Sequence, residues 1–358
     1  MIIDRVYVEE PLIGNFAVVN FLKNYSRKIE PEYFVDFEIL IKNLNLKLNY
    51  ESGKHTIVFK QNKGRFLKKC PCTSNVQPCG YYVLNIIQNC YIGCSYCYLQ
   101  QYVNNNIILI NPNIEQIPDE LDELLNNSQP EKIYRLGSGE FSDSLLFDEY
   151  TGITEKLLNM MNKFDRIYFE IKTKTDNIGH LLKSFSEGNE KTVFAWSVNP
   201  QKIIVSEEPL AASLENRLAA AKSAVHHNYN LGFHFDPVII YEGWEKDYND
   251  LIEKIFFEIP AEKIMWFSIG SFRCAPELIP IIKKNNPQSK TYQTELIKGT
   301  DGKIRYPRFI RERVYSIIID KIRKYTEKAV IYLCMENIKV WNSANADNPE
   351  KILNFKWR

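Results

Sequence analysis

The sequence predicts an α/β fold, a partial (β/α)6 barrel with an N-terminal α/β extension and a C-terminal helix-strand element. Three observations lead to this expectation. Strand-like and helix-like segments alternate six times after residue 80, no flexible linker interrupts them, and 358 residues lie within the range of one α/β barrel. Such units form a parallel sheet with helical crossovers. Because six units are too few for a closed eight-stranded barrel, we expect an open barrel with one side free for a large substrate.

The predicted strands are rich in Ile, Val, Phe and Tyr, which sheets favour. They cover 81–87, 132–136, 166–172, 192–198, 231–240 and 263–269. The predicted barrel helices cover 117–125, 152–162, 178–185, 213–227, 248–257 and 276–284. The helix from Ser213 is the clearest, because serine is a good N-cap residue and strong helix formers follow it.

The segments on either side of the barrel do not follow this alternation. Residues 1–79 are predicted as an extension with a helix over 31–43 and a strand over 54–60. The barrel itself is expected to span 80–290. Residues 291–358 form a C-terminal element, with a helix over 308–327 and a strand over 329–334, and are a candidate substrate-binding region.

Composition and charge restrict the class of protein. Hydrophobic residues make up 45% and charged residues 25% of the chain, as in globular proteins. No apolar run approaches the roughly 18–20 residues that span a bilayer, and acids stand at the start where a signal peptide is basic and apolar. We therefore expect a cytoplasmic protein with no membrane partner. The net charge of +1 argues against indiscriminate coating of nucleic acid, but it leaves room for local basic patches.

Three cysteines follow the first predicted barrel strand at the spacing C-x3-C-x2-C, namely Cys90, Cys94 and Cys97. Three thiolates occupy three of the four irons of a 4Fe–4S cluster, which leaves one iron open to a small molecule. The amino and carboxylate groups of S-adenosylmethionine (SAM) suit that iron. One electron from the cluster then breaks a carbon–sulfur bond of SAM and gives a 5′-deoxyadenosyl radical. With the aromatic Tyr96 before the last cysteine, this spacing predicts a radical SAM enzyme.

Other interpretations of these cysteines are a structural zinc knuckle and three inert buried thiols. Structural zinc takes four closed ligands, and no histidine lies near the motif. A third class of function is a cluster-bearing binding or sensor protein with no turnover.

Further motifs appear in the order found in one known family. They are Cys97-Tyr98-Leu99-Gln100, Phe141-Ser142-Asp143, Thr173-Lys174, Ser197-Val198-Asn199, Arg217-Leu218-Ala219-Ala220-Ala221, Leu231-Gly232-Phe233 and Glu242-Gly243-Trp244-Glu245. Over residues 80–270 the chain thereby resembles spore photoproduct lyase, a radical SAM family of DNA repair. In that family the adenosyl radical takes a hydrogen atom from C6 of a methylene-linked thymine dimer. The dimer then fragments, and a cysteine returns a hydrogen atom to the product radical.

The resemblance implies roles for particular residues. Tyr96 would pack on the adenine of SAM, and the SAM pocket would be lined by Tyr98, Ser142, Lys174, Ser197 and Asn199. Tyr98 would also be catalytic, as one of the tyrosines that relay a hydrogen atom back to SAM. An electron donor of the flavodoxin or ferredoxin type and DNA are the implied partners. The plain alternative for each residue is a polar side chain at the barrel rim.

The chain departs from the family where the lyase has its hydrogen-donating cysteine, because Glu140 stands there. The preceding Gly137-Ser138-Gly139 looks like the glycine-rich segment of radical SAM enzymes, in which the backbone approaches SAM and a carboxylate binds its amino group. We therefore expect Glu140 to bind SAM, with a solvated rim glutamate as the alternative. A carboxylate cannot donate a hydrogen atom. The lyase reaction therefore needs another donor here, or the substrate is a small molecule, a peptide or RNA.

The remaining cysteines suggest two further roles. Cys70, Cys72 and Cys79 are candidates for an auxiliary iron–sulfur or zinc site, with Cys274 or Cys334 as a fourth ligand. Ordinary packing is the alternative. Cys274 follows the sixth predicted strand and is a candidate catalytic hydrogen-atom donor near the barrel mouth.

Two further segments carry polar residues of interest. Residues 303–313 mix basic and aromatic side chains as a nucleic-acid contact does, with a solvated charged face as the alternative. His234 and Asp236 alternate with phenylalanines on a predicted strand and can therefore point into the barrel.

Overall fold

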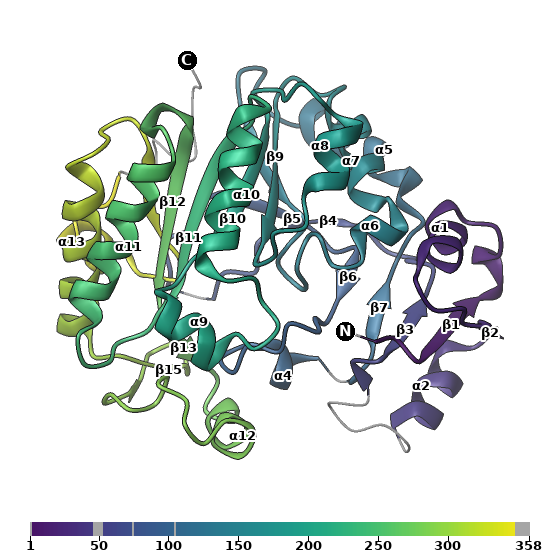
Figure 1. Ribbon diagram of the computed structural model, residues 1–358, viewed down its shortest axis with the longest axis horizontal. Helices are drawn as coiled ribbons and strands as arrows, with labels where there is room; N and C mark the ends of the chain where they lie inside the picture. Colours follow the sequence, from purple (N-terminus) through teal and green to yellow (C-terminus); the bar gives the residue numbers. More distant parts are fainter. Residues whose placement is uncertain (1, 46–52, 74, 104, 348–358) are drawn as a thin grey trace.

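The computed structural model describes residues 2–45, 53–73, 75–103 and 105–347. Within them, eight strands form a curled main sheet in the order β16-β12-β11-β10-β9-β8-β5-β4 (Figure 1). Neighbouring strands run parallel except β4, which is antiparallel to β5. In chain order these strands are β4 (Leu67–Lys69), β5 (Tyr81–Leu84), β8 (Tyr134–Gly137), β9 (Ile167–Thr173), β10 (Thr192–Ser197), β11 (Asn230–Val238), β12 (Ile264–Ser271) and β16 (Val330–Leu333).

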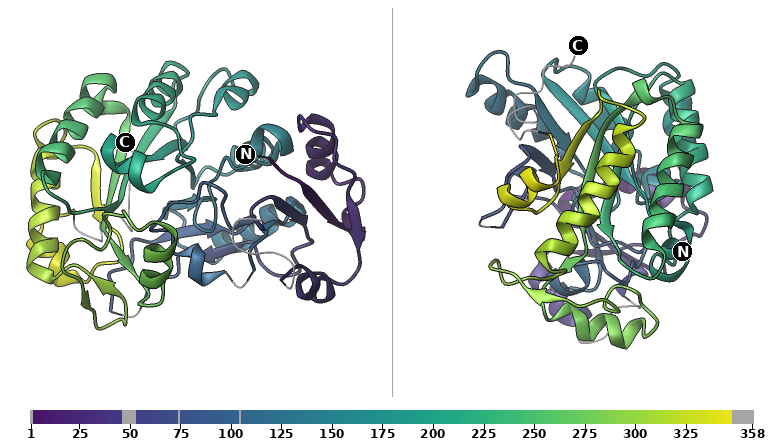
Figure 2. Two further views of the ribbon diagram at one scale, coloured as in Figure 1. Left: turned by 60° about the horizontal axis from the view of Figure 1, so that its bottom comes forward. Right: turned by 90° about the vertical axis from the view of Figure 1, so that its left-hand side faces the viewer.

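The helices between these strands cover the outer face of the sheet. Helices α10, α11 and α13 lie over strands β10, β11 and β12 (Figures 1 and 2). The longer helices are α5 (Ile117–Asn126), α7 (Ile153–Met161), α10 (Leu214–His226), α11 (Trp244–Glu258), α12 (Leu278–Asn285) and α13 (Arg308–Arg323). The short ones are α4 (Leu99–Tyr102), α6 (Asp148–Thr151), α8 (Gly179–Ser184), α9 (Gln201–Glu207), α14 (Ile338–Ser343), η2 (Ile114–Gln116) and η3 (Ala261–Lys263). Among the described helices, none has the length and hydrophobicity required to cross a bilayer.

Two smaller sheets flank the half-barrel. The N-terminal sheet has the strand order β2 (Glu32–Phe34), β1 (Arg5–Glu9), β3 (Thr56–Phe59), β7 (Ile108–Ile110) and β6 (Ile87–Gln88). It carries η1 (Glu10–Leu12), α1 (Phe16–Asn24) and α2 (Phe37–Asn45) and lies at the side of the molecule away from α13 (Figure 1). The other small sheet consists of β13 (Arg273–Cys274), β15 (Ile304–Arg305) and β14 (Ile297–Lys298).

The predicted partial barrel is confirmed. Each of the six predicted barrel strands is present, and the C-terminal strand predicted over 329–334 joins the same sheet as β16. Ser213 caps α10 by accepting a hydrogen bond from the backbone N–H of Asn216 at 3.1 Å. Strand pairing crosses the boundaries predicted near residues 79 and 290, because β4 and β16 both belong to the main sheet.

The helix predicted over 31–43 is wrong in its first part. Residues 32–34 form β2, which pairs in parallel with β1. The helix begins only after Asp36, whose carboxylate accepts hydrogen bonds from the backbone N–H groups of Glu38 at 2.8 Å and Ile39 at 3.1 Å. This side chain satisfies the first N–H groups of the helix and so decides where the helix starts.

A buried carboxylate, Glu170 of β9, joins four strands on the inner face of the half-barrel. It accepts hydrogen bonds from the Tyr81 hydroxyl of β5 and from Trp266 Nε1 of β12 at 2.9 Å. His234 Nε2 of β11 lies 2.7 Å from its Oε1. Burial alone would raise the pKa of Glu170, but the charge and hydrogen bond of His234 outweigh it and hold the pKa at about 2.

Two glycines make room for the partners of Glu170. A Cβ on Gly137 would lie 1.6 Å from the Tyr81 hydroxyl, and one on Gly232 would lie 2.4 Å from Trp266 Nε1. Any larger residue at either position would therefore push the aromatic ring away from the carboxylate. The glycine inside each strand is explained by this close packing.

The Glu170 network predicts a pH dependence of stability. The folded pKa of Glu170, about 2, lies below the ordinary value of about 4.3. Its ionisation therefore stabilises the fold above about pH 4.3, and this contribution is lost as the pH falls toward 2. Glu170→Gln should lower the free energy of unfolding at pH 7 by about 3–5 kcal/mol, as when one partner of a buried pair is removed.

Urea unfolding of the metal-free chain between pH 7 and 3, followed by tryptophan fluorescence, measures both effects. The Glu170→Gln variant should lose less stability on acidification than the native chain. The exposed Glu187 gives the control Glu187→Gln, which should leave the acid limb unchanged. An acid limb that is the same in native and Glu170→Gln chains would contradict this account.

Candidate active site

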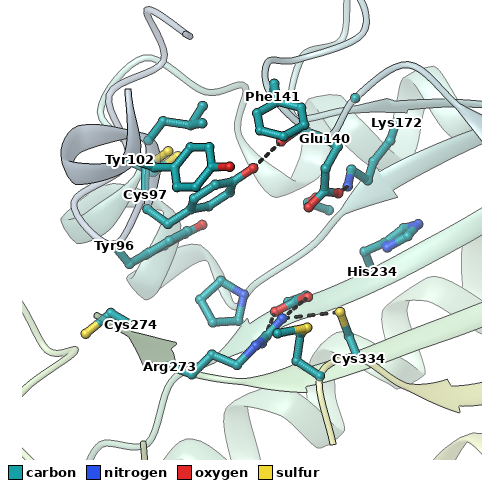
Figure 3. A pocket seen from close by; sticks show the side chains of 18 of the residues that line it. Tyr96, Cys97, Tyr102, Glu140, Phe141, Lys172, His234, Arg273, Cys274 and Cys334 are labelled. Carbon is teal, nitrogen blue, oxygen red and sulfur yellow. Dashed lines mark hydrogen bonds and ion pairs between the residues drawn. The ribbon is translucent and has the colours of Figure 1, made fainter. Parts of the chain in front are cut away.

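A cavity of about 500 Å³ lies on the inner side of the half-barrel, where the carboxyl ends of the parallel strands meet. Open parallel sheets hold their ligands at this edge. The cavity brings together most of the residues predicted from the sequence: Cys70, Cys72, Cys79, Cys90, Cys94, Tyr96, Cys97, Tyr98, Glu140, Ser142, Lys174, Ser197 and Cys274. Figure 3 shows several of them around this pocket. Asn199 does not line the cavity, since it is 1% exposed and lies behind the wall.

The loop that carries Cys90, Cys94 and Cys97 follows β6 and turns through two left-handed residues. Asn89 (φ 70°) places its side-chain oxygen 2.9 Å from the backbone N of Cys90, while its amide nitrogen donates to the Ile107 carbonyl at 3.0 Å. Gly93 has φ 73°, a conformation that a side chain would strain. The backbone N–H of Cys97 then donates to the Cys94 carbonyl at 3.0 Å. These contacts present the cysteine loop to the cavity.

The three thiols of this loop line one cavity and are the ligand type that a 4Fe–4S cluster takes. In the described part of the chain, no three Cys, His, Asp or Glu side chains surround a position for one metal ion. A cubane cluster attaches each thiolate to a different iron, so its ligands need not converge on one point. Burial raises the pKa of all three thiols, that of Cys90 to about 12, while the charge of Lys174 lowers it at Cys94 and Cys97.

Tyr96 is held from behind by a buried ion pair. Its hydroxyl donates to Glu208, which also accepts from Asn199 Nδ2 at 3.1 Å and from Arg217 Nη2 at 2.5 Å. Burial raises the pKa of Glu208, but the charges of Arg217 and Lys174 outweigh it and hold the pKa below its usual value. Asn199 therefore contacts Glu208 from behind the cavity wall and does not itself line the cavity.

Glu208 is a functional residue that the sequence reasoning missed. The sequence did contain an indication of Glu208. Arg217 stands among alanines and a leucine on α10, a helix whose inner face is apolar. A buried arginine there requires an acid partner. Its guanidinium also donates to the Ser197 carbonyl at 2.7 Å, so it joins the end of β10 to the cysteine loop.

Asp143 fixes the backbone at Lys174, and Ser142 makes its own contact with the cysteine loop. Its carboxylate accepts hydrogen bonds from the Lys174 N–H at 2.7 Å and the Thr173 hydroxyl at 2.8 Å. Ser142 donates to the Asn89 carbonyl at 2.8 Å, directly before the first cysteine of the loop. The Lys174 ammonium lies 6.0 Å from the Tyr96 ring centroid. The ends of β8 and β9 are thus tied to the cysteine loop.

Glu140 lies in the cavity and pairs with a lysine. Its carboxylate is 3.4 Å from Lys172 Nζ, and its backbone carbonyl accepts the Tyr98 hydroxyl at 2.9 Å (Figure 3). Gly139 is needed for protein packing, since a Cβ there would lie 2.9 Å from the Lys172 carbonyl. Close packing against protein neighbours therefore explains both Gly137 and Gly139. Close approach of the backbone to SAM is not needed to account for either glycine.

The basic and aromatic segment 303–313, a candidate nucleic-acid contact or solvated charged face, is exposed only in part. Tyr306 is fully buried, and Arg305 pairs with Asp301 inside the protein. Arg311 is buried against Glu336. Arg308 and Arg313 stay exposed and pair with Glu312 and Glu245 at the surface. Lys303 alone among these residues lines the cavity.

Cys274 and His234 both line the cavity. Cys274 is 2% exposed, and burial together with Glu277 raises its pKa to about 12, so its thiol stays protonated at neutral pH. His234 also belongs to the Glu170 network, which explains its place on the inner face of β11.

Comparison with known proteins agrees with this geometry. The profile of the family described as spore photoproduct lyase matches residues 41–333. Spore photoproduct lyase of Clostridium acetobutylicum is 26% identical over 290 residues, covering 79% of this chain and 83% of that protein. The Bacillus subtilis enzyme is 28% identical over 244 residues, covering 67% and 69%.

A solved structure of a spore photoproduct lyase variant with bound AdoMet and dinucleoside spore photoproduct has the same fold. It superposes with a TM-score of 0.80 at 20% identity, covering 93% of this chain and 99% of that one. The half-barrel and the family match define the class of protein, a radical SAM enzyme of lyase type. Within that class, the chain belongs to the spore photoproduct lyase family.

The Glu208–Arg217 pair predicts a large loss of stability when one partner is removed. Arg217→Met leaves Glu208 buried without its cation and should cost about 3–5 kcal/mol. Adding Glu208→Leu should recover part of this loss, because no uncompensated charge then remains.

Urea unfolding of the single and double variants measures the effect. The exposed pair of Arg27 and Asp4 provides a control, since Arg27→Met should cost at most about 1 kcal/mol. A double variant less stable than Arg217→Met would sink the idea that an unpaired charge causes the loss.

Proposed function

We propose that the chain holds a 4Fe–4S cluster through Cys90, Cys94 and Cys97, cleaves SAM, and repairs a methylene-linked thymine lesion in DNA. The observation that carries the proposal is the place of this C-x3-C-x2-C loop on the cavity wall, beside Ser142, Lys174 and Ser197, in a chain of the spore photoproduct lyase family. When bound, cluster and SAM supply a 5′-deoxyadenosyl radical by one-electron cleavage of a carbon–sulfur bond. An electron donor of the flavodoxin or ferredoxin type would reduce the cluster.

The chain's own residues bind and orient SAM in this proposal. Tyr96, held by Glu208, packs on the adenine, and Ser142, Ser197 and Lys174 provide polar groups beside it. Glu140 accepts a hydrogen bond from the SAM amino group. Its ion pair with Lys172 holds the carboxylate at the cavity.

The hydrogen-atom donor must differ from that of the family, because Glu140 has no hydrogen atom to give. Cys274 is our candidate donor, since its thiol is protonated and belongs to the same cavity wall. Tyr98, hydrogen-bonded to the backbone of residue 140, would return the hydrogen atom toward SAM. Arg273 and Lys303 add positive charge to the cavity, which suits a phosphate-bearing substrate.

Glu140 also favours a second candidate function, radical chemistry on a substrate other than this thymine dimer. Glu140 stands where the family has its hydrogen-donating cysteine. A reaction on a small molecule, a peptide or RNA would not need that donor. Assay of 5′-deoxyadenosine with and without dinucleoside spore photoproduct separates the two. Cleavage that the photoproduct stimulates, with thymine products released, supports repair. Cleavage indifferent to the photoproduct supports the second function.

Replacing Cys90, Cys94 and Cys97 together by Ala should abolish 5′-deoxyadenosine formation after anaerobic reconstitution, because each thiolate is a direct cluster ligand. Product is measured by chromatography under dithionite reduction. Cys274→Ala serves as the thiol control, since it should retain SAM cleavage while losing repaired product. A triple variant that still cleaves SAM would refute the assignment of the cluster.

Glu140→Gln should weaken SAM binding by about 1.5–3 kcal/mol, the range for a hydrogen bond to a charged group, while the cluster absorbance remains. Equilibrium binding of SAM to the reconstituted chain measures this, with Glu187→Gln as the exposed control. Glu140→Cys tests the rival role of this position. Unchanged SAM affinity in Glu140→Gln, together with repair gained in Glu140→Cys, would show that position 140 is a donor slot and not a SAM ligand.

A further inference from the structure

Four cysteines outside the C-x3-C-x2-C loop face the cavity from two edges of the main sheet. Cys70, Cys72 and Cys79 lie in the loop between β4 and β5, and Cys334 follows β16 directly. All four are free cysteines. Strands β4 and β16 are the first and last in the order of the main sheet, so only its curl can bring these cysteines together.

Contacts across the opening show that the two edges do meet. The backbone N–H of Gln77 donates to the Glu336 carbonyl at 2.7 Å, which ties the β4–β5 loop to the segment after Cys334. The guanidinium of Arg135 lies 4.6 Å from the Tyr332 ring and donates to the Cys79 carbonyl at 3.0 Å. The pairing of β4 with β5 is extended by the N–H of Cys70, which donates to the Tyr81 carbonyl at 2.9 Å.

The four cysteines line the same cavity. The backbone N–H of Cys72 donates to the Cys70 carbonyl at 2.8 Å, which holds these two cysteines beside each other. Cys274 is not in this group. Burial and Glu277 account for its pKa, and its sulfur points away from Cys334 in Figure 3.

Positive groups surround these thiols. Arg273 Nη2 donates to Cys334 Sγ at 3.2 Å while Nη1 pairs with Asp236 at 2.8 Å (Figure 3). Arg135 lies beside Cys79, and Lys303 lines the cavity near Cys72. Several thiolates in a partly buried place need such compensating charge and hydrogen bonds.

We propose that Cys70, Cys72, Cys79 and Cys334 are the ligands of a second 4Fe–4S cluster. In a 4Fe–4S cluster each of four cysteine thiolates attaches to a different iron, so the thiolates need not converge on one point as they do around a single zinc ion. Unlike the first cluster, this one has four cysteine ligands and no iron open to SAM. It lies at the same cavity, where the substrate would bind.

This inference does not depend on SAM cleavage or on DNA as substrate. The full chain is reconstituted anaerobically with iron and sulfide, desalted, and assayed for iron, sulfide and zinc. The native chain should hold about eight irons, and the Cys90→Ala/Cys94→Ala/Cys97→Ala variant should keep about four, one cubane cluster. On that triple-variant background, adding Ala at Cys70, Cys72, Cys79 and Cys334 should remove the remaining iron.

Single substitutions on the same triple-variant background identify the fourth ligand. Cys334→Ala should lose most of the remaining iron or alter its electron paramagnetic resonance spectrum on reduction. The matched control is Cys274→Ala, a cysteine of the same cavity that should leave iron and spectrum unchanged. Circular dichroism and thermal unfolding confirm that each variant is folded.

Several results would overturn the inference. They are a folded triple variant that binds no metal, one that binds a single zinc without iron, and loss of its iron in Cys274→Ala but not in Cys334→Ala. Failure of the proposed function appears differently. A native chain that holds about eight irons yet forms no 5′-deoxyadenosine would refute SAM cleavage and leave the second cluster standing.

Discussion

The carboxylate of Glu170 is the interaction on which the arrangement of the half-barrel depends. The inner face of an open sheet is not fully packed with side chains as it is in a closed barrel. It also cannot be wholly apolar, because polar ligands bind there. Glu170 is a polar group on this face whose charge is met by contacts from three other strands, through Tyr81, His234 and Trp266. A buried carboxylate with fewer donors would be costly. The curvature that these contacts require brings the carboxyl ends of the strands around one cavity.

A second buried carboxylate, Glu208, positions residues at the cavity. Glu208 has no contact with the solvent, yet it joins Tyr96, Asn199 and Arg217 and thereby links the cysteine loop to β10 and α10. The two networks have different tasks. Glu170 shapes the sheet, whereas Glu208 sets the orientation of an aromatic ring at the cavity. In both cases the charge is compensated within the protein, so other charged residues of the cavity wall, among them Glu140, Lys174 and Lys303, can address a ligand.

The resemblance to the lyase family implies a difference in chemistry at position 140. In the structure Glu140 is paired with Lys172, and its backbone carbonyl accepts the Tyr98 hydroxyl. A carboxylate without such a partner would be an uncompensated charge in a half-buried place. The lysine on β9 therefore lets the cavity hold an acid at this position.

Much of this protein follows from local sequence alone. The six barrel strands, the cap at Ser213 and the spacing of Cys90, Cys94 and Cys97 are local patterns, since strand propensity, capping and loop chelation involve residues close in the chain. Tertiary structure alone decided that Glu208 partners Arg217, that Arg305 and Arg311 are buried in ion pairs, and that the segment after Cys334 meets the loop of Cys70. These contacts join residues far apart in the chain, and the curl and strand order of the sheet determine which strand ends meet. No periodicity in the sequence encodes which strands meet, because contacts such as those of Glu170 with Tyr81 and Trp266 join residues on separate strands.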